Sequence, residues 1–293
     1  MSHKAGFVSI IGYPNVGKST LMNALLGESL SIITPKAQTT RHRIMGIFSA
    51  DDYQIVYSDT PGVITPHYKL HRAMMSAVFA ALDDADVVLL VTEPNNDFRQ
   101  AEILSKLKES AIPVIVVINK IDLGNMTVLE TEVAKWMKLM ENATVLPVSA
   151  LHNLNLDQVF KAILHHLPES PAFYPKDELT DRSQRFFISE IIREKILLNF
   201  SQEVPYSTEV AVESFKEEDH ITRITATIFV ARDTQKGILL GHQGSAIKNL
   251  GTQARRDIEA FLDKHIFLEL RVKVAKDWRE DERALKRFGY SVE

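Results

Sequence analysis

Residues 12–20 read GYPNVGKST, and this stretch decides the fold of the first part of the chain. Its first eight positions fit the pattern G-x-x-x-x-G-K-[S/T], in which a glycine-rich loop joins a strand to a helix and its backbone N–H groups surround a phosphate. The context agrees, because the apolar run FVSIIG (7–12) precedes the loop and the amphipathic stretch 19–27 follows it. In such a loop Lys18 would reach the β- and γ-phosphates, and the Ser19 hydroxyl would bind Mg²⁺.

Short β-branched runs alternate with amphipathic stretches around this loop. We expect strands at 7–12, 53–59, 86–92, 113–119 and 144–149, and helices at 19–27, 68–83, 101–110, 127–142 and 156–167. Continuous apolar strands separated by helices are typical of a mostly parallel sheet with helices on both faces. The first domain is therefore predicted to have an α/β P-loop fold.

Three further motifs follow, each at the end of an expected strand. Asp59 of the sequence DTPG would hold the Mg²⁺ shell through water, and the N–H of Gly62 would contact the γ-phosphate. Asp122 of the sequence NKID offers two carboxylate oxygens, which match the adjacent N1–H and N2–H₂ donors of guanine; adenine has no such pair. The backbone of Ser149 and Ala150 would contact the edge of the base.

Each of these motifs alone is more often an ordinary turn or strand end. Together they occur in order at the carboxyl ends of strands, where open α/β sheets bind their ligands. The sequence therefore predicts a guanine-nucleotide site that binds GTP and GDP. Its expected residues are Gly12, Tyr13, Pro14, Asn15, Val16, Gly17, Lys18, Ser19, Thr20, Asp59, Thr60, Pro61, Gly62, Asn119, Lys120, Asp122, Ser149, Ala150 and Leu151.

The stretch PKAQTTRHR (35–43) lies between the phosphate loop and DTPG. A threonine here would complete the Mg²⁺ shell when a γ-phosphate is bound and release it afterwards. We favour Thr40 and keep Thr39 as the second candidate; without the other motifs, a polar loop before a strand would be the preferred interpretation. The expected Mg²⁺ ligands are then Ser19, Thr40 and Asp59, partly through water.

The expected catalytic residues are Lys18, Thr40 (or Thr39) and Gly62. In many GTP-hydrolysing switches, a glutamine follows the glycine of the Asp-x-x-Gly motif and orients the attacking water. Val63 stands at that position here, and its side chain cannot hydrogen-bond to water. Either intrinsic hydrolysis is slow, or another group, an ion or a partner aligns the water.

With 293 residues the chain is long enough for two domains, and its 45% hydrophobic and 25% charged residues are typical of a soluble globular protein. The chain has no cysteine, which excludes disulfides, thiolate metal ligands and cysteine nucleophiles. The N-terminus lacks a signal-peptide pattern, and the longest apolar runs, at 87–91 and 114–118, are too short to cross a bilayer. We expect a cytoplasmic protein.

A second domain follows the stretch PESPAFYPKDELTDR (168–182). Closely spaced prolines favour an extended connector, so we place a linker at 171–182 between domains at 1–170 and 183–293. An ordered excursion over the surface of the first domain is the alternative. We expect a helix at 183–200, strands at 208–215 and 221–231, helices at 236–240 and 245–263, and a strand at 265–275, followed by a C-terminal helix. The order α-β-β-α-α-β predicts a compact α+β domain with a three-stranded sheet.

A second glycine-framed loop, GHQG (241–244), joins the two short helices of this domain. This is the setting of a KH fold, whose GXXG loop clamps the backbone of about four nucleotides of RNA. A lone GxxG is more often a helix-capping turn, and only the order of the surrounding elements favours RNA binding. The expected RNA-binding residues are Lys236, Ile238, Leu239, Gly241, His242, Gln243, Gly244, Ile247, Lys248 and Arg255, with Arg256 as a further positive charge. Among them, Ile247 and Leu239 would line an apolar groove.

With these motifs in place, the whole chain resembles the Era family of bacterial GTPases, which belong to the translation-factor-related class and carry a C-terminal KH domain. The resemblance rests on GYPNVGKST, KAQTTRHRI, DTPG, NKID, VSAL, VPYS (204–207), GHQG and WREDERALKRFGY (278–290). It implies a type II KH fold, GTP and Mg²⁺ as ligands, and binding to small-subunit ribosomal RNA near its 3′ end. It also implies a role in maturation of the small ribosomal subunit.

Three site details follow from the same resemblance. A hydrophobic residue at the position of Val63 is a family trait. The loop pair His242-Gln243 lacks the lysine that many relatives carry there, so phosphate binding would depend more on Lys248. Asn15 stands where similar GTPases bind K⁺, which implies a K⁺ ion that stimulates hydrolysis.

Three functions remain open at this point. The favoured one is an RNA-dependent GTP switch, on the motifs and the family resemblance; the net charge of +4 on residues 221–293 is weak evidence alone. In the second, the KH domain docks a protein or a membrane, with peripheral association at the inner face of the cell membrane; the net charge of −5 on residues 201–220 is compatible with this. The third is a plain nucleotide hydrolase with a structural appendage. We expect no DNA partner.

Overall fold

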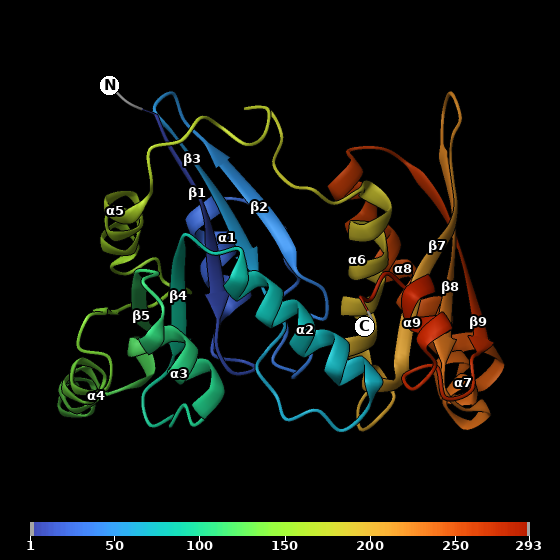
Figure 1. The fold of residues 1–293 in the computed structure, drawn as a ribbon. Helices are drawn as coiled ribbons and strands as arrows, with labels where there is room; N and C mark the ends of the chain where they lie inside the picture. Colours follow the sequence, from blue (N-terminus) through green and yellow to red (C-terminus); the bar gives the residue numbers. More distant parts are fainter. Residues whose placement is uncertain (1–2, 292–293) are drawn as a thin grey trace. The chain divides into compact units, whose positions relative to one another are not determined.

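The structure is a computed structural model that describes residues 3–291 (Figure 1). The chain groups into two compact units. Unit 1 comprises Met1–Ser31, Thr40–Thr65 and Met74–Asp181, and unit 2 comprises Ile32–Thr39, Pro66–Ala73 and Arg182–Glu293. Two short segments from the first part of the sequence therefore pack with the second part, whereas the sequence analysis assigned both to the first domain.

Unit 1 is built on a sheet with the strand order β2-β3-β1-β4-β5-β6. The strands are β1 (Lys4–Ile11), β2 (Ile44–Ser49), β3 (Tyr53–Asp59), β4 (Val87–Thr92), β5 (Val114–Ile118) and β6 (Thr144–Pro147). Neighbouring strands are parallel except β2 and β3, which are antiparallel. The five expected strands are present, and β2 is an edge strand that the sequence analysis did not include.

The helices of the P-loop fold cover both faces of this sheet, which is why every residue of β4 and β5 is buried. They are α1 (Lys18–Leu26), α2 (Lys69–Asp83), α3 (Ala101–Glu109), α4 (Met126–Leu139) and α5 (Leu156–His166), with a short 3₁₀ helix at Ile121–Leu123. Side chains of α2, α3 and α4 share one apolar cluster with Val88 and Val116. In Figure 1, α2 and α3 lie in front of the sheet and α1 lies behind it.

The proline-containing stretch after α5 runs along unit 1 as far as Asp181. The side chain of Gln54 donates to the carbonyl of Tyr174 (2.8 Å) and accepts from its N–H (3.0 Å). Further along, the Thr180 hydroxyl donates to the carbonyl of Met45 (2.7 Å), which lies on β2. Residues 168–181 therefore follow the ordered path that the sequence analysis kept as its alternative, and the chain passes to unit 2 at Arg182.

Unit 2 contains a three-stranded sheet in the order β7-β8-β9. Its elements are α6 (Gln184–Asn199), a 3₁₀ helix at Pro205–Ser207, β7 (Thr208–Glu217), β8 (Thr222–Val230), α7 (Asp233–Leu240), a 3₁₀ turn at His242–Gly244, α8 (Ser245–Leu262), β9 (Ile266–Val274) and α9 (Glu282–Arg287). Strands β7 and β8 are antiparallel, and β8 and β9 are parallel. The α-β-β-α-α-β order of a type II KH domain is confirmed, and α9 extends it.

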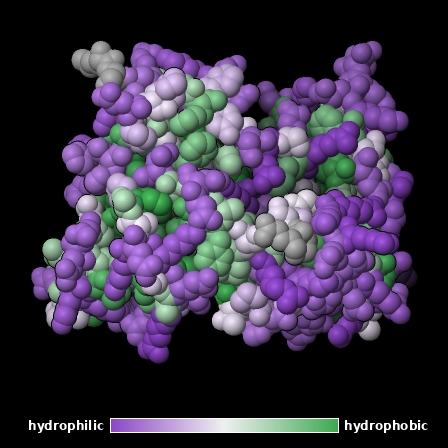
Figure 2. All heavy atoms as spheres, in the orientation of Figure 1, coloured by the Kyte–Doolittle hydropathy of each residue, from purple (hydrophilic) through white to green (hydrophobic). Residues whose placement is uncertain are grey.

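The core of unit 2 forms where α6 and α8 pack against the sheet. Ile192 of α6, Ile228 of β8 and Ala254 of α8 are all fully buried in one apolar cluster. Figure 2 shows that hydrophilic side chains dominate the visible surface, with apolar ones in scattered patches. Among residues 3–291, no helix is both long enough and apolar enough to span a bilayer.

Candidate functional site

The phosphate loop of unit 1 connects β1 to α1, as the motif requires. Gly17, directly before α1, has φ +95°, and a Cβ atom there would lie 2.3 Å from Nδ2 of Asn119. Only glycine satisfies both conditions. Asn15 is also left-handed, with φ +65°, and is exposed. The loop therefore has the tight backbone path that lets N–H groups converge on a phosphate.

Lys18 is buried at the base of this loop. Its Nζ donates to the carbonyls of Gly12 (3.2 Å) and Tyr13 (2.9 Å). Burial lowers the pKa of Lys18 to about 8, and the nearby carboxylate of Asp59 offsets this only in part. A polyphosphate beside this amine would favour its charged form again.

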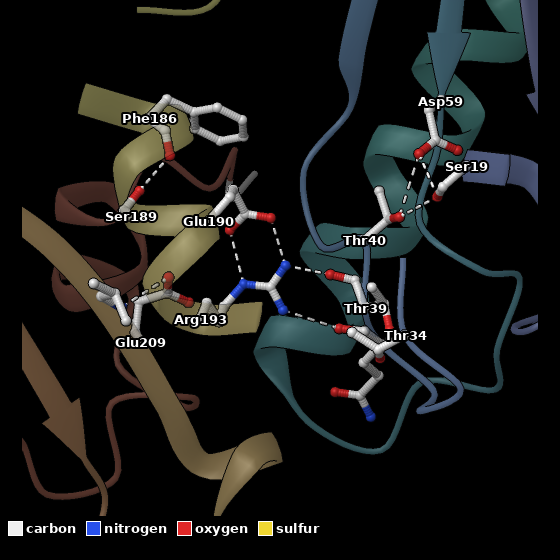
Figure 3. A network of polar contacts seen from close by, with 12 residues as sticks. Ser19, Thr34, Thr39, Thr40, Asp59, Phe186, Ser189, Glu190, Arg193 and Glu209 are labelled. Atoms are coloured by element: carbon white, nitrogen blue, oxygen red, sulfur yellow. Dashed lines mark hydrogen bonds and ion pairs between the residues drawn. The ribbon is translucent and has the colours of Figure 1, made fainter. Parts of the chain in front are cut away.

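The hydroxyls of Ser19 and Thr40 meet the carboxylate of Asp59 (Figure 3). Ser19 Oγ donates to Asp59 Oδ2 (2.6 Å), Thr40 Oγ1 donates to the same oxygen (3.3 Å), and the two hydroxyls are 2.9 Å apart. The second carboxylate oxygen, Oδ1, is buried and makes no hydrogen bond within residues 3–291. Burial raises the pKa of Asp59, which Lys18 and the hydroxyl donors do not fully offset.

This set of oxygens fits a magnesium ion. A buried carboxylate with an unused oxygen next to two hydroxyls offers the hard oxygen ligands that Mg²⁺ prefers. A cation there would also neutralise the carboxylate, which burial otherwise disfavours. Ser19, Thr40 and Asp59, which the sequence analysis selected as metal ligands, are thus brought together.

The hydroxyl of Thr39, the second candidate, points elsewhere. It donates to the carbonyl of Lys36 (2.6 Å) and lies 2.7 Å from the hydroxyl of Thr34, so it stabilises its own turn within unit 2. Geometry thus favours Thr40 as the ligand and leaves Thr39 a structural role.

The DTPG segment packs directly on the phosphate loop. A Cβ atom on Gly62 would lie 2.7–2.8 Å from three atoms of Pro14, two of them backbone. The N–H of Val63 donates to the carbonyl of Gly12 (3.0 Å), while the Thr60 hydroxyl donates to a carbonyl of β1 (2.7 Å) and Pro61 is buried. Gly62 therefore has no room for a side chain where the two motifs meet.

Val63 does not face the nucleotide side. Its side chain is 1% exposed and belongs to the apolar cluster with Ile11, Met75 and Val78. A side chain with this orientation packs in the core and cannot align a water molecule. Val63 therefore differs from the glutamine of many GTP-hydrolysing switches in residue type, and its side chain also lies in the apolar core.

The base-binding motifs are joined to the phosphate loop by Asn119. Its Nδ2 donates to the carbonyl of Val16 (2.9 Å), and its Oδ1 accepts from the N–H of Ala150 (2.9 Å). Lys120 Nζ donates to the carbonyl of Asn15 (2.6 Å) and pairs with Glu93 (2.5 Å). The sequence analysis assigned Asn119 and Lys120 to nucleotide binding; their contacts also fix the relative positions of the three loops.

Asp122 stands at the end of this motif with its carboxylate partly exposed. The Ser149 hydroxyl donates to its Oδ1 (2.5 Å). This hydrogen bond holds the pKa of Asp122 below its usual value, and the nearby His152 and Lys120 contribute to the same shift. The group is thus a stable carboxylate, as recognition of guanine requires.

Tyr13, Thr20 and Leu151 were also predicted to bind the nucleotide. The ring of Tyr13 packs on Phe98 with centroids 4.7 Å apart, and its hydroxyl accepts from the N–H of Arg99 (3.0 Å). Thr20 is half-buried in α1. The side chain of Leu151 is 72% exposed, so it lies at the surface beside the base-binding motifs.

The GHQG loop of unit 2 has an unusual backbone. Gly241 has φ +70° and Gly244 has φ +77°, and Gln243 between them is left-handed with φ +50°. A Cβ atom on Gly241 would lie 2.7 Å from Cβ of Ala246. The tight turn exposes His242 and Gln243 directly before α8, whose first N–H groups have no intrahelical partners.

A groove of about 390 Å³ runs between α8 and β9, next to this loop. It is lined by Ile247, Lys248, Gly251, Thr252, Arg255, Ile266, Phe267, Leu268 and Leu270. Three expected RNA residues, Ile247, Lys248 and Arg255, therefore share one surface. Lys236 is half-buried and Ile238 is 49% exposed on α7.

Two corrections concern this groove. Leu239 was expected to line it, but its side chain is 0% exposed inside the core of unit 2, because α7 turns that side toward α8 and the sheet. Phe267 was missed; it is 49% exposed on β9, with the guanidinium of Arg223 over its ring at 5.4 Å. The signal was the alternation in HIFLELRVKV, which puts Phe267 on a face opposite Ile266.

The late motifs VPYS and WREDERALKRFGY hold unit 2 together. Trp278 is fully buried and its indole N–H donates to the carbonyl of Ser207 (3.0 Å), so the two motifs are in direct contact. The loop after Trp278 binds the segment Pro66–Ala73: the N–H of Leu70 donates to the carbonyl of Arg279 (3.0 Å). Lys69 Nζ also pairs with Glu282 (2.6 Å).

Comparison with known proteins identifies both a GTPase part and a KH part in this chain. A family model described as a 50S ribosome-binding GTPase matches residues 7–120, and one described as a KH domain matches residues 203–279. The GTPase Era of Syntrophus aciditrophicus (strain SB) is 44% identical over 292 residues, covering 98% of this chain and 95% of that protein. The GTPase Era of Staphylococcus haemolyticus (strain JCSC1435) is 42% identical over 291 residues, covering 98% and 97%.

Solved structures give the same result. Era in complex with MgGDPNP and nucleotides 1506–1542 of 16S ribosomal RNA has a TM-score of 0.94 and 38% identity, with 99% of this chain and 100% of that chain covered. A single-substitution variant of Aquifex aeolicus Era bound to GDP·AlF₄⁻ matches with the same TM-score, identity and coverage.

Proposed function

The chain belongs to the GTPase Era family, and on that premise we propose that it is a GTP-hydrolysing switch that binds small-subunit ribosomal RNA near its 3′ end and assists assembly of that subunit. The observation that carries the proposal is the groove between α8 and β9, which lies beside the GHQG loop and exposes Lys248 and Arg255. The similar protein solved with MgGDPNP holds 16S ribosomal RNA at the same time.

The choice of the small subunit depends on which comparison includes the RNA-binding unit. The model described by the 50S ribosome ends at residue 120 and so excludes the KH part of unit 2. The relative bound to 16S ribosomal RNA is matched along 99% of this chain. The match to the structure with 16S ribosomal RNA therefore supports the choice of RNA. The match to the 50S ribosome-binding GTPase model concerns only the nucleotide-binding part.

In the proposed reaction, Lys18 and the loop N–H groups bind the phosphates, and Asp122 selects guanine. Ser19, Thr40 and Asp59 would hold Mg²⁺, and the ion would neutralise charge that develops on the phosphates. Gly62 offers its N–H to the γ-phosphate. Because Val63 packs in the core, another group, an ion or a partner would align the attacking water.

We propose K⁺ as that ion, next to the exposed Asn15 of the phosphate loop. The expected result is a kcat for GTP several-fold higher in KCl than in NaCl at equal ionic strength. Asn15→Ala should remove most of this difference while GDP affinity stays close to that of the wild type, because GDP binding depends on Lys18 and the loop amides. Equal rates in the two salts would exclude the ion.

The RNA proposal is tested by the double substitution His242→Asp and Gln243→Asp. Two carboxylates at an exposed loop before α8 should repel phosphates, so the Kd for an RNA of nucleotides 1506–1542 of 16S ribosomal RNA should rise about tenfold or more at about 0.15 M salt. Binding is measured with a non-hydrolysable GTP analogue and with GDP, at two salt concentrations.

The matched control carries the same charge change elsewhere in unit 2, as Ser201→Asp with Gln202→Asp, both exposed and outside the groove. It should bind RNA within about twofold of the wild type, because neither residue lines the groove. If the loop variant binds RNA normally, the GHQG loop is not the RNA site. If the wild type binds anionic vesicles or a protein instead of RNA, unit 2 is a docking unit of another kind.

A further inference from the structure

Helix α6 buries charged side chains where a packed helix normally carries apolar ones. Arg193 is 1% exposed and Glu190 is 5% exposed. Charged residues are almost never fully buried without a reason. Replacing a buried ion pair by apolar residues of similar size is often neutral or stabilising, so stability alone does not explain this pair.

The contacts of the Arg193 guanidinium suggest another reason (Figure 3). One edge forms a two-point pair with Glu190: Nε donates to Oε1 (2.7 Å) and Nη2 donates to Oε2 (2.5 Å). Two further N–H groups point away from the pair. Nη1 donates to the carbonyl of Gln38 (3.3 Å), and Nη2 donates to the carbonyl of Thr39. The planar guanidinium therefore holds two consecutive carbonyl groups in one orientation.

The bound segment, residues 32–39, is irregular and is also held by side-chain contacts. Residues Ile32–Thr39 contain no helix or strand, and Gln38 is left-handed with φ +57°. The side chain of Gln38 lies 3.0 Å from Nε2 of His71, and the Lys36 amine donates to the carbonyl of Phe200. Of these contacts, those of the guanidinium hold the main-chain carbonyls at positions 38 and 39.

The orientation of the Thr39 carbonyl also restricts the next residue, Thr40. The carbonyl of Thr39 and Cα of Thr40 belong to the same planar peptide group, which has no free rotation. Fixing the direction of that carbonyl therefore restricts where the Thr40 side chain can point. Thr40 is the residue whose hydroxyl lies beside Ser19 and Asp59.

We propose that Arg193, oriented by Glu190, is a positioning residue for Thr40 and so for the Mg²⁺ shell of the GTP-bound protein. The inference rests on the proposed role of Thr40 as a magnesium ligand. Arg193 touches neither nucleotide nor metal; it acts through the peptide group between residues 39 and 40. A residue of the RNA-binding unit thereby sets the hydrolysis rate at the nucleotide.

The test replaces the pair by apolar residues, as Glu190→Leu with Arg193→Met, so that neither member of the pair is left buried without the other. The expected result is a kcat for GTP lower by about tenfold or more, since small displacements of catalytic groups are costly. The Mg²⁺ concentration for half-maximal hydrolysis should rise, while the Kd for GDP should stay within about twofold. Arg193→Lys should not restore kcat, because an ammonium group cannot hold two carbonyls and a carboxylate in one plane.

The matched control is Lys195→Met on the same helix. Lys195 is also buried, and its ion-pair partners are Glu194 and Asp257, both of which lie outside residues 32–39. It should leave kcat and Mg²⁺ dependence unchanged. If the double variant folds, as judged by its thermal unfolding, and keeps wild-type kcat and Mg²⁺ dependence, Arg193 is purely structural and the inference is wrong.

Thr40→Val separates this inference from the proposal on which it rests. Loss of hydrolysis in Thr40→Val with normal hydrolysis in the double variant would reject only the positioning role. Unchanged Mg²⁺ dependence in Thr40→Val would reject Thr40 as the ligand, and with it the role given to Arg193. Parallel losses in both variants, with GDP binding intact, support the two together.

Discussion

Asp122→Asn is expected to change the preferred base from guanine to xanthine, with a combined shift in selectivity of about a thousandfold or more. The carboxylate accepts from both N1–H and N2–H₂ of guanine. An amide keeps one acceptor and turns the other position into a donor, which would face a donor of the base. Because Ser149 holds one carboxylate oxygen at 2.5 Å, the side chain cannot rotate away from the mismatch without losing that bond.

The expected measurement is the Kd for GDP and for xanthosine diphosphate in both proteins. The variant should bind GDP about a hundredfold more weakly, because buried donors and acceptors are left unpaired. Xanthine carries a carbonyl where guanine has its 2-amino group, so it should gain affinity from the new amide N–H. The control is Asp157→Asn, the same chemical change at an exposed ion pair with Lys161 on α5. Unaltered GDP affinity in Asp122→Asn would place the base elsewhere.

Gly62→Ala is expected to lower kcat for GTP about a hundredfold while leaving GDP binding nearly intact. The added methyl group would lie 2.7–2.8 Å from Pro14, and two of the three nearest atoms are backbone, which cannot move without distorting the phosphate loop. The DTPG segment must then shift away, and the hydrogen bond from Val63 N–H to Gly12 would lengthen. The N–H proposed to reach the γ-phosphate moves with it.

Gly124→Ala is the matched control, because its added methyl group would have no neighbour closer than 3.8 Å. It should keep kcat within about twofold of the wild type. Single-turnover hydrolysis and GDP affinity distinguish loss of catalysis from loss of binding. A Gly62→Ala protein that hydrolyses GTP at the wild-type rate would show that this glycine does not take part in the reaction.

The sequence could predict which motifs lie together around the phosphate loop, because each motif is contiguous and most of the strands are parallel. A motif such as NKID is visible in four letters, and the parallel sheet brings the end of its strand next to the phosphate loop. The KH-type order was predictable for a similar reason, since the strands of unit 2 are bounded by clear turns. Local pattern and fold agree at both places.

The contacts between distant segments could not be predicted in this way. Nothing in the sequence near Asn119 shows that its amide spans from Val16 to Ala150. Helical periodicity leaves open whether Leu239 faces the groove or the core, because both surfaces are apolar. The burial of Arg193 has no signal in the sequence at all, since a charged residue on an amphipathic helix is normally solvated.

The position of residues 278–282 in the sequence also affects when the contacts of unit 2 can form during synthesis. Unit 2 joins residues separated by 154 positions, at Arg193 and Thr39, and by 213 positions, at Lys69 and Glu282. Chains emerge from the ribosome N-terminus first, and domains generally fold in that order. The sheet of unit 1 can form early, but the segment Ile32–Thr39 lacks its partners until residues 193–200 have emerged. The segment Pro66–Ala73 lacks its partners until residues 279–282 have emerged. A nascent chain therefore cannot acquire the full set of these contacts before residue 282 has emerged.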